Sequence, residues 1–192
     1  MVRASTGSMR QVIVQLSDWF YARAKAAVIL LLLIGMVGLV SLPIADEELV
    51  SQSLDGRPGY SAAEAFDAVE AYGEAGRAQM IWIHVGDFVL LAIYTAAFCL
   101  TTSWLFQRAF KPSNPLWRLN TLPLMGGFFD VLENVWIIAL ILAFPYRPYP
   151  VAWLATLSTT GKYLMGVPII GLLIVGTVGV AVHGFRLRSE GH

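Results

Sequence analysis

The sequence has few charged residues and almost no cysteine. Of its 192 residues, 14% are charged and 57% are hydrophobic. A soluble domain carries about 25% charged residues, so this deficit indicates a membrane protein. The single cysteine, Cys99, lies in an apolar segment. Because one thiol forms neither an internal disulfide nor a dithiol redox pair, the sequence argues against a thiol–disulfide membrane enzyme.

The sequence also has no net charge and lacks several common nucleotide-binding and catalytic motifs. The formal net charge is zero, which argues against nucleic acid as a partner. The sequence contains no dinucleotide-binding fingerprint, no phosphate-binding loop and no nucleophile elbow. We therefore expect no cofactor.

Four apolar stretches are long enough to cross a bilayer, which requires about 20 helical residues. They cover residues 26–45, 80–106, 122–144 and 151–185. The sequence therefore predicts an all-α fold, a polytopic four-helix transmembrane bundle in a membrane domain of residues 26–185. The first stretch follows basic residues, as a signal peptide does. Its apolar run exceeds the usual core of a signal peptide, so we expect an uncleaved span.

A helix is expected before the first span. In residues 1–25, apolar side chains recur at helical spacing from Met9 to Phe20, with polar residues largely elsewhere around the helix. This pattern suits a helix that lies in the headgroup layer. It suits a cytoplasmic extension of the first span equally well.

The outer loop, residues 46–79, is expected to contain a short helix. Ser61 and Glu64 have the spacing of a capping box, which predicts a helix start. Gly73 and Gly76 should interrupt the chain just before the second span. This outer helix would pack over the spans or act as a lid.

The basic residues predict the orientation in the membrane. Nine lysines and arginines lie before the first span, between the second and third spans, or after the fourth, and three lie in the other two connections. The positive-inside rule then places both termini, with the tail of residues 186–192, in the cytoplasm. The expected location is a bacterial plasma (inner) membrane, with the lipid bilayer as the first partner.

Six polar side chains within the predicted spans are candidate site residues. They are His84 and Asp87 in the second span, Asp130, Glu133 and Asn134 in the third, and Lys162 in the fourth. Spacings of three and four residues place those of each span on one helical face. An ionisable side chain that faced lipid would cost several kcal/mol, so we expect the six to face inward and meet.

The expected cluster has three acids and one lysine, so protons or another cation must balance its charge. The favoured interpretation is a structural network that fixes helix association. The first alternative is a site that binds or transports a cation or a polar lipid-like ligand. The second is an intramembrane enzyme with Asp130 and Glu133 as acid and base acting on a lipophilic substrate. The third is a metal site at His84, Asp87, Asp130 and Glu133, whose ligand types give no strong transition-metal signature.

Taken together, these features resemble an uncharacterised family of small bacterial four-span integral membrane proteins. The resembling features are Tyr60 ahead of the capped outer helix, Gly76-Arg77, Asp87, the run Phe129-Asp130-x-x-Glu133-Asn134, and Lys162. The resemblance covers roughly residues 26–180 and implies no activity, substrate or cofactor. The buried acids are also similar to those of sterol isomerase-type membrane proteins, but this chain lacks that family's fuller pattern, so no role is transferred. The sequence leaves open an oligomer or a role as a subunit.

Overall fold

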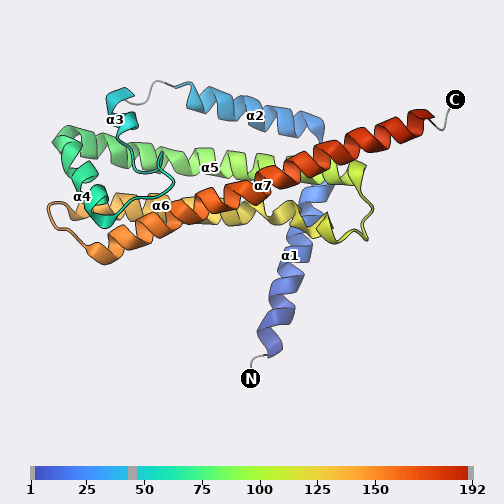
Figure 1. Ribbon diagram of the computed structural model, residues 1–192, viewed down its shortest axis with the longest axis horizontal. Helices are drawn as coiled ribbons and strands as arrows, with labels where there is room; N and C mark the ends of the chain where they lie inside the picture. Colours follow the sequence, from blue (N-terminus) through green and yellow to red (C-terminus); the bar gives the residue numbers. More distant parts are fainter. Residues whose placement is uncertain (1–2, 43–46, 190–192) are drawn as a thin grey trace. The chain divides into compact units, whose positions relative to one another are not determined.

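The computed structural model describes residues 3–42 and 47–189, and its regular elements within these ranges are helices. In chain order they are α1 (Arg3–Arg23), α2 (Ala26–Val40), α3 (Glu47–Ser51), α4 (Ala62–Ala71), α5 (Gly73–Ala109), the 3-10 helix η1 (Pro115–Thr121), α6 (Pro123–Ala143) and α7 (Tyr149–Ser189) (Figure 1). The predicted all-α class is therefore confirmed for the described part of the chain.

Within the described residues, three stretches are long and apolar enough to cross a membrane. They are α5, the combined η1 and α6 stretch Pro115–Ala143, and α7 as far as Phe185. A fourth candidate arises if α1 and α2 are taken as one broken span, bent by 96°. α2 has 15 residues and is about 22 Å long at 1.5 Å per residue. Residues 43–45 of the expected first span lie outside the described residues.

The start of the second apolar helix differs most from the expectation. It begins at Gly73 rather than at residue 80, so α5 has about two more turns at this end. Gly73 has a φ of +64° and separates α4 from α5, and a glycine adopts this left-handed conformation without steric cost. Gly76 does not interrupt the chain as expected. It lies inside α5, where a Cβ atom would be 3.1 Å from a methyl group of Leu49.

The chain forms two compact units, and α5 and α7 contribute to both. The first unit contains Met1–Gly35, Tyr94–Leu124 and Val167–His192, and the second contains Met36–Ile93 and Met125–Gly166. Each unit has its own apolar core, so each is described separately.

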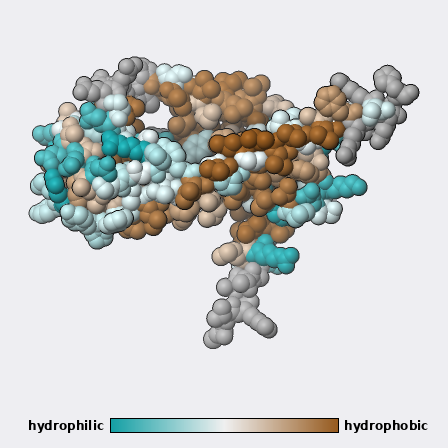
Figure 2. Space-filling model, in the orientation of Figure 1, coloured by the Kyte–Doolittle hydropathy of each residue, from teal (hydrophilic) through white to brown (hydrophobic). Residues whose placement is uncertain are grey.

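In the second unit, the outer helix α4 packs its apolar face into the core. Phe66, Val69 and Tyr72 are buried there together with Ile137 and Leu140 of α6. The predicted capping box is confirmed, because the Glu64 amide donates to Ser61 Oγ and the Ser61 amide donates to Glu64 Oε2. Figure 2 shows hydrophilic surface over α4, in contrast to the hydrophobic surface of α2.

In the first unit, glycines allow α7 to approach α5 closely. A Cβ atom on Gly176 would lie 2.9 Å from Leu105 Cβ, and one on Gly179 would lie 2.7 Å from Ala109 Cβ. Larger residues at either position would force the two helices apart. Cys99 is fully buried in this unit, where it packs as a small apolar side chain.

Candidate functional site

The candidate site lies in the second unit and is centred on α6. Asp130, Glu133 and Asn134 are three and four residues apart, so they share one face of this helix. Their exposed fractions are 5%, 0% and 1%. α6 therefore carries two acids and an amide in its buried face.

One lysine joins both acids of α6. Lys162 Nζ, from α7, lies 3.3 Å from Asp130 Oδ1 and also forms an ion pair with Glu133 Oε2. The lysine side chain is 23% exposed, whereas the two acidic side chains are 8% and 0% exposed. The two carboxylates thus share one ammonium group that reaches the edge of the cluster.

Gly161 sets the distance between α6 and α7 next to this ion pair. A Cβ atom on Gly161 would lie 2.6 Å from the ring of Phe129, which precedes Asp130 on α6. That separation is too short for a real contact, so only glycine lets α7 come this close without a shift. The close approach brings Lys162 within reach of the two acids.

A second set of contacts links α5 to α6. His84 Nδ1 lies 2.7 Å from Asn134 Oδ1, and Asn134 Nδ2 donates to Asp87 Oδ2 over 2.7 Å. Because an amide oxygen only accepts, the histidine donates from Nδ1. In the neutral ring, Nε2 is then an acceptor, and it has no hydrogen-bond partner among the described residues.

The structure thus brings the six predicted residues into two groups that meet on α6. One group is the ion-paired set of Asp130, Glu133 and Lys162, and the other is the hydrogen-bonded chain of His84, Asn134 and Asp87. We call the six residues the polar cluster. Within the described residues, no three histidine, cysteine, aspartate or glutamate side chains lie close enough to hold a metal ion.

The loop between α3 and α4 is a part of the site that the sequence analysis missed. Near its end, Tyr60 donates its amide hydrogen to Thr156 Oγ1 over 3.1 Å, and the threonine hydroxyl donates to Tyr60 O over 2.6 Å. The Tyr60 hydroxyl lies 3.3 Å from Thr159 Oγ1. Burial raises the pKa of Tyr60 well above its usual value, so the phenol is neutral at physiological pH.

The same loop continues along α7 towards Lys162. Thr160 Oγ1 donates to Pro58 O over 3.4 Å, and the Tyr163 hydroxyl donates to Asp55 O over 3.3 Å. The Asp55 carboxylate is close enough to interact electrostatically with Lys162. The loop therefore adds a fourth acid near the polar cluster.

The sequence contains a pattern that could have indicated the docking of the loop on α7. Four hydroxyl side chains of α7 recur at helical spacing on one face and receive the loop; they are Thr156, Thr159, Thr160 and Tyr163. The loop itself contains Gly56, Pro58 and Gly59, which are typical of an irregular segment. The hydroxyl stripe alone does not reveal its partner, because threonine also bonds back to its own helix.

Comparison with protein-family models, curated proteins and solved structures gave no match.

Proposed function

We propose that this protein is a four-span integral membrane protein of a bacterial plasma membrane with both termini in the cytoplasm. The support is the set of three apolar helices and the apolar helix α2, which follows α1 after a bend of 96°, together with the nine-to-three distribution of basic residues. The resemblance to small bacterial four-span proteins agrees with this arrangement. Its function is structural or accessory, and the polar cluster holds the spans together.

The observation that carries the structural role is the pairing of buried groups between helices. Lys162 of α7 joins Asp130 and Glu133 of α6, and Asn134 of α6 joins His84 and Asp87 of α5. Lipid offers no driving force comparable to the hydrophobic effect for helix association, so polar contacts and close packing stabilise the bundle. Between α6 and α7, the ion pairs of Lys162 supply the polar contacts, and Gly161 allows the close packing.

Labelling of introduced cysteines tests the orientation. The native Cys99 is buried, so a membrane-impermeant maleimide should label the unmodified protein weakly. Asp67→Cys, on α4, should react in intact cells, whereas Lys111→Cys, between α5 and η1, should react only after the membrane is opened. Equal labelling of both positions in intact cells would contradict a membrane crossing by α5, and the reverse pattern would contradict the proposed orientation.

A second candidate function is the binding of a proton, a cation or a polar lipid-like ligand. It is favoured by the excess of acids over Lys162 and by Glu133 Oε1, which is buried and accepts no hydrogen bond from the described residues. Burying such an oxygen costs the full free energy of desolvation, because no hydrogen bond replaces those to water. A proton or a ligand that donates to it would remove this cost.

Native mass spectrometry of the protein released from detergent tests the second candidate. A co-purifying lipid or small molecule that disappears in Glu133→Gln, while Thr177→Val retains it, would support binding. Thr177 is a suitable control because its hydroxyl is exposed and bonds to its own helix. Identical masses for both variants and the unmodified protein would argue against a bound ligand.

A further inference from the structure

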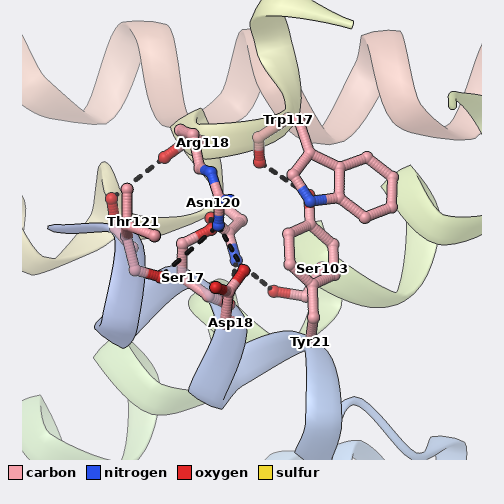
Figure 3. Close-up of polar contacts among 9 residues, drawn as sticks. Ser17, Asp18, Tyr21, Ser103, Trp117, Arg118, Asn120 and Thr121 are labelled. Atoms are coloured by element: carbon pink, nitrogen blue, oxygen red, sulfur yellow. Dashed lines mark hydrogen bonds and ion pairs between the residues drawn. The ribbon is translucent and has the colours of Figure 1, made fainter. Parts of the chain in front are cut away.

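The first unit holds α1 in a fixed orientation through a buried polar contact. Ser17 Oγ donates to Asn120 Oδ1 over 2.7 Å, and Asn120 Nδ2 donates to Ser103 Oγ over 2.8 Å and to Ser17 O over 3.2 Å (Figure 3). All three side chains are fully buried. Asn120 therefore uses its amide oxygen and both amide hydrogens to join α1, α5 and η1.

An aromatic contact and an ion pair reinforce this attachment. The Tyr21 ring stacks on Trp117 with ring centres 4.1 Å apart, and its hydroxyl donates to Trp117 O over 2.6 Å. Arg118 forms an ion pair with Asp18 (Figure 3). We call this set, with the contacts of Asn120, the α1 clamp. It fixes α1 to η1 and α5 within the first unit, so the direction of α1 is set by tertiary contacts.

The clamp uses one side of α1 and leaves an apolar stripe exposed beside it. At 3.6 residues per turn, the side chains of the stripe fall together on the helix surface. They are Met9, Val12, Ile13, Leu16 and Trp19, with exposed fractions between 40% and 70%. We call these residues the α1 stripe. Gln11 and Gln15 lie on the other side of the helix and are also exposed.

The α1 segment and the connection that packs against it are basic. Residues 8–25 and the connection 107–121 together contain six basic residues and one acid, Asp18, which Arg118 already pairs. Arg23 places its guanidinium 4.1 Å from the centre of the Trp19 ring at the edge of the stripe. An arginine next to a partly exposed tryptophan is typical of the membrane–water interface.

We infer that the α1 stripe binds the surface of an anionic lipid bilayer. The chain turns by 96° between α1 and α2, so α1 lies along the membrane surface if α2 runs across the membrane. The stripe then enters the headgroup layer, while the glutamines face water and the basic residues meet lipid phosphates. The proposed orientation makes this the cytoplasmic leaflet.

The charge distribution favours lipid over a second copy of the chain as the occupant. Pairing two α1 stripes would bring two sets of basic residues together, and the resulting repulsion would oppose the dimer. An anionic leaflet offers the opposite charge at the same place. The sequence pattern alone had left an interfacial helix and a cytoplasmic extension equally open, and the bend with its clamp favours the former.

Spin labels on the two sides of α1 test this inference. Leu16→Cys places a label on the α1 stripe and Gln11→Cys places one on the polar side, one turn away. The full chain is reconstituted in vesicles of phosphatidylcholine with and without 30% phosphatidylglycerol. We expect the Leu16 label to collide with dissolved oxygen at least three times more effectively than with a water-soluble nickel chelate, and the Gln11 label to show the reverse preference.

The lipid composition supplies the second readout. With anionic lipid, Arg10→Gln combined with Lys25→Gln should at least halve the preference of the Leu16 label for oxygen, while the same pair should change little in pure phosphatidylcholine. Equal accessibility of both labels to the nickel chelate would overturn the inference. A short distance between Leu16 labels of two chains by dipolar spectroscopy would also overturn it, because a second copy would then cover the stripe.

Discussion

Replacing Lys162 with methionine should destabilise the protein by removing the ammonium group that Asp130 and Glu133 share. Breaking a buried ion pair by removing one partner costs about 3–5 kcal/mol in soluble proteins. Interhelical hydrogen bonds in membranes contribute only about 0.6 kcal/mol on average. The lysine side chain is 23% exposed, and the acids can take up protons. We therefore expect a loss of about 2–3 kcal/mol, below the buried-pair range but above that of a neutral hydrogen bond.

Reversible unfolding in mixed micelles, followed by circular dichroism as the fraction of denaturing detergent rises, measures this loss. Lys111→Met is the matched control, because Lys111 is exposed outside the helices. The double variant of Lys162→Met with Glu133→Gln should be more stable than the sum of the two single losses by about 1 kcal/mol or more, because it removes one of the stranded charges. A loss below about 0.6 kcal/mol for Lys162→Met, with additive effects in the double variant, would refute the structural role of the ion pair.

Three further predictions concern the second unit. Gly161→Ala should lower the unfolding free energy by about 1–3 kcal/mol through overpacking against an aromatic ring of α6. The control Gly166→Ala, with nothing within 4 Å of its added Cβ, should be neutral or slightly stabilising. Equal effects of the two variants in the same detergent titration would contradict the close approach of α7 to α6. The Ser61 amide lowers the pKa of Glu64 below its ordinary value of 4.5. The ionised Glu64 therefore stabilises the folded protein above pH 4.5, and this stabilisation is lost as the pH falls through the lowered pKa. The unmodified protein should melt at a higher temperature than Glu64→Gln near neutral pH but not at acid pH, and a difference that grows at acid pH would contradict this. Thr156→Val removes two hydrogen bonds to Tyr60 and should speed the amide hydrogen exchange of the loop of residues 52–60 about tenfold, which corresponds to about 1.4 kcal/mol in all. Unchanged exchange would show that other contacts hold the loop.

The three long apolar helices could be predicted well because few structures suit such a sequence in a membrane. A long apolar run must satisfy its backbone hydrogen bonds internally, which a helix does. Prolines then mark the ends: Pro123 begins α6 and Pro145 follows it, so the predicted residues 122–144 differ by one residue at each end from the observed helix. α5 extends further than predicted because its first two turns, from Gly73, are polar and lie beyond the apolar run.

The meeting of the cluster residues could be predicted from the cost of burying charge in lipid, together with helical spacing. What could not be predicted is the docking of the outer loop on α7, since it depends on contacts between residues about 100 positions apart, such as Tyr60 and Thr156. The 3-10 helix η1 was not predicted, for the same reason. Its Asn120 is positioned by Ser17, which is 103 residues away.

The excess charge of the ion-paired set of Asp130, Glu133 and Lys162 can be assigned to Glu133. One lysine pairs with two carboxylates, and both carboxylate oxygens of Glu133 are buried and accept no hydrogen bond from the described residues. A proton on Glu133 would therefore neutralise the excess charge of this set.

Glu133→Gln distinguishes a proton from a bound cation at this position. Glutamine has nearly the shape of a protonated glutamate and the same charge. If Glu133 carries the proton, the variant should unfold within about 1 kcal/mol of the unmodified protein, because little beyond one neutral hydrogen bond changes. If a cation or a lipid-like amine occupies the site instead, the variant should lose that ligand in native mass spectrometry and also lose the stability that the ligand confers by mass action. A destabilisation of 2 kcal/mol or more with no ligand lost would exclude both a proton on Glu133 and a bound cation. It would mean that Glu133 is ionised and that its ion pair with Lys162 stabilises the protein.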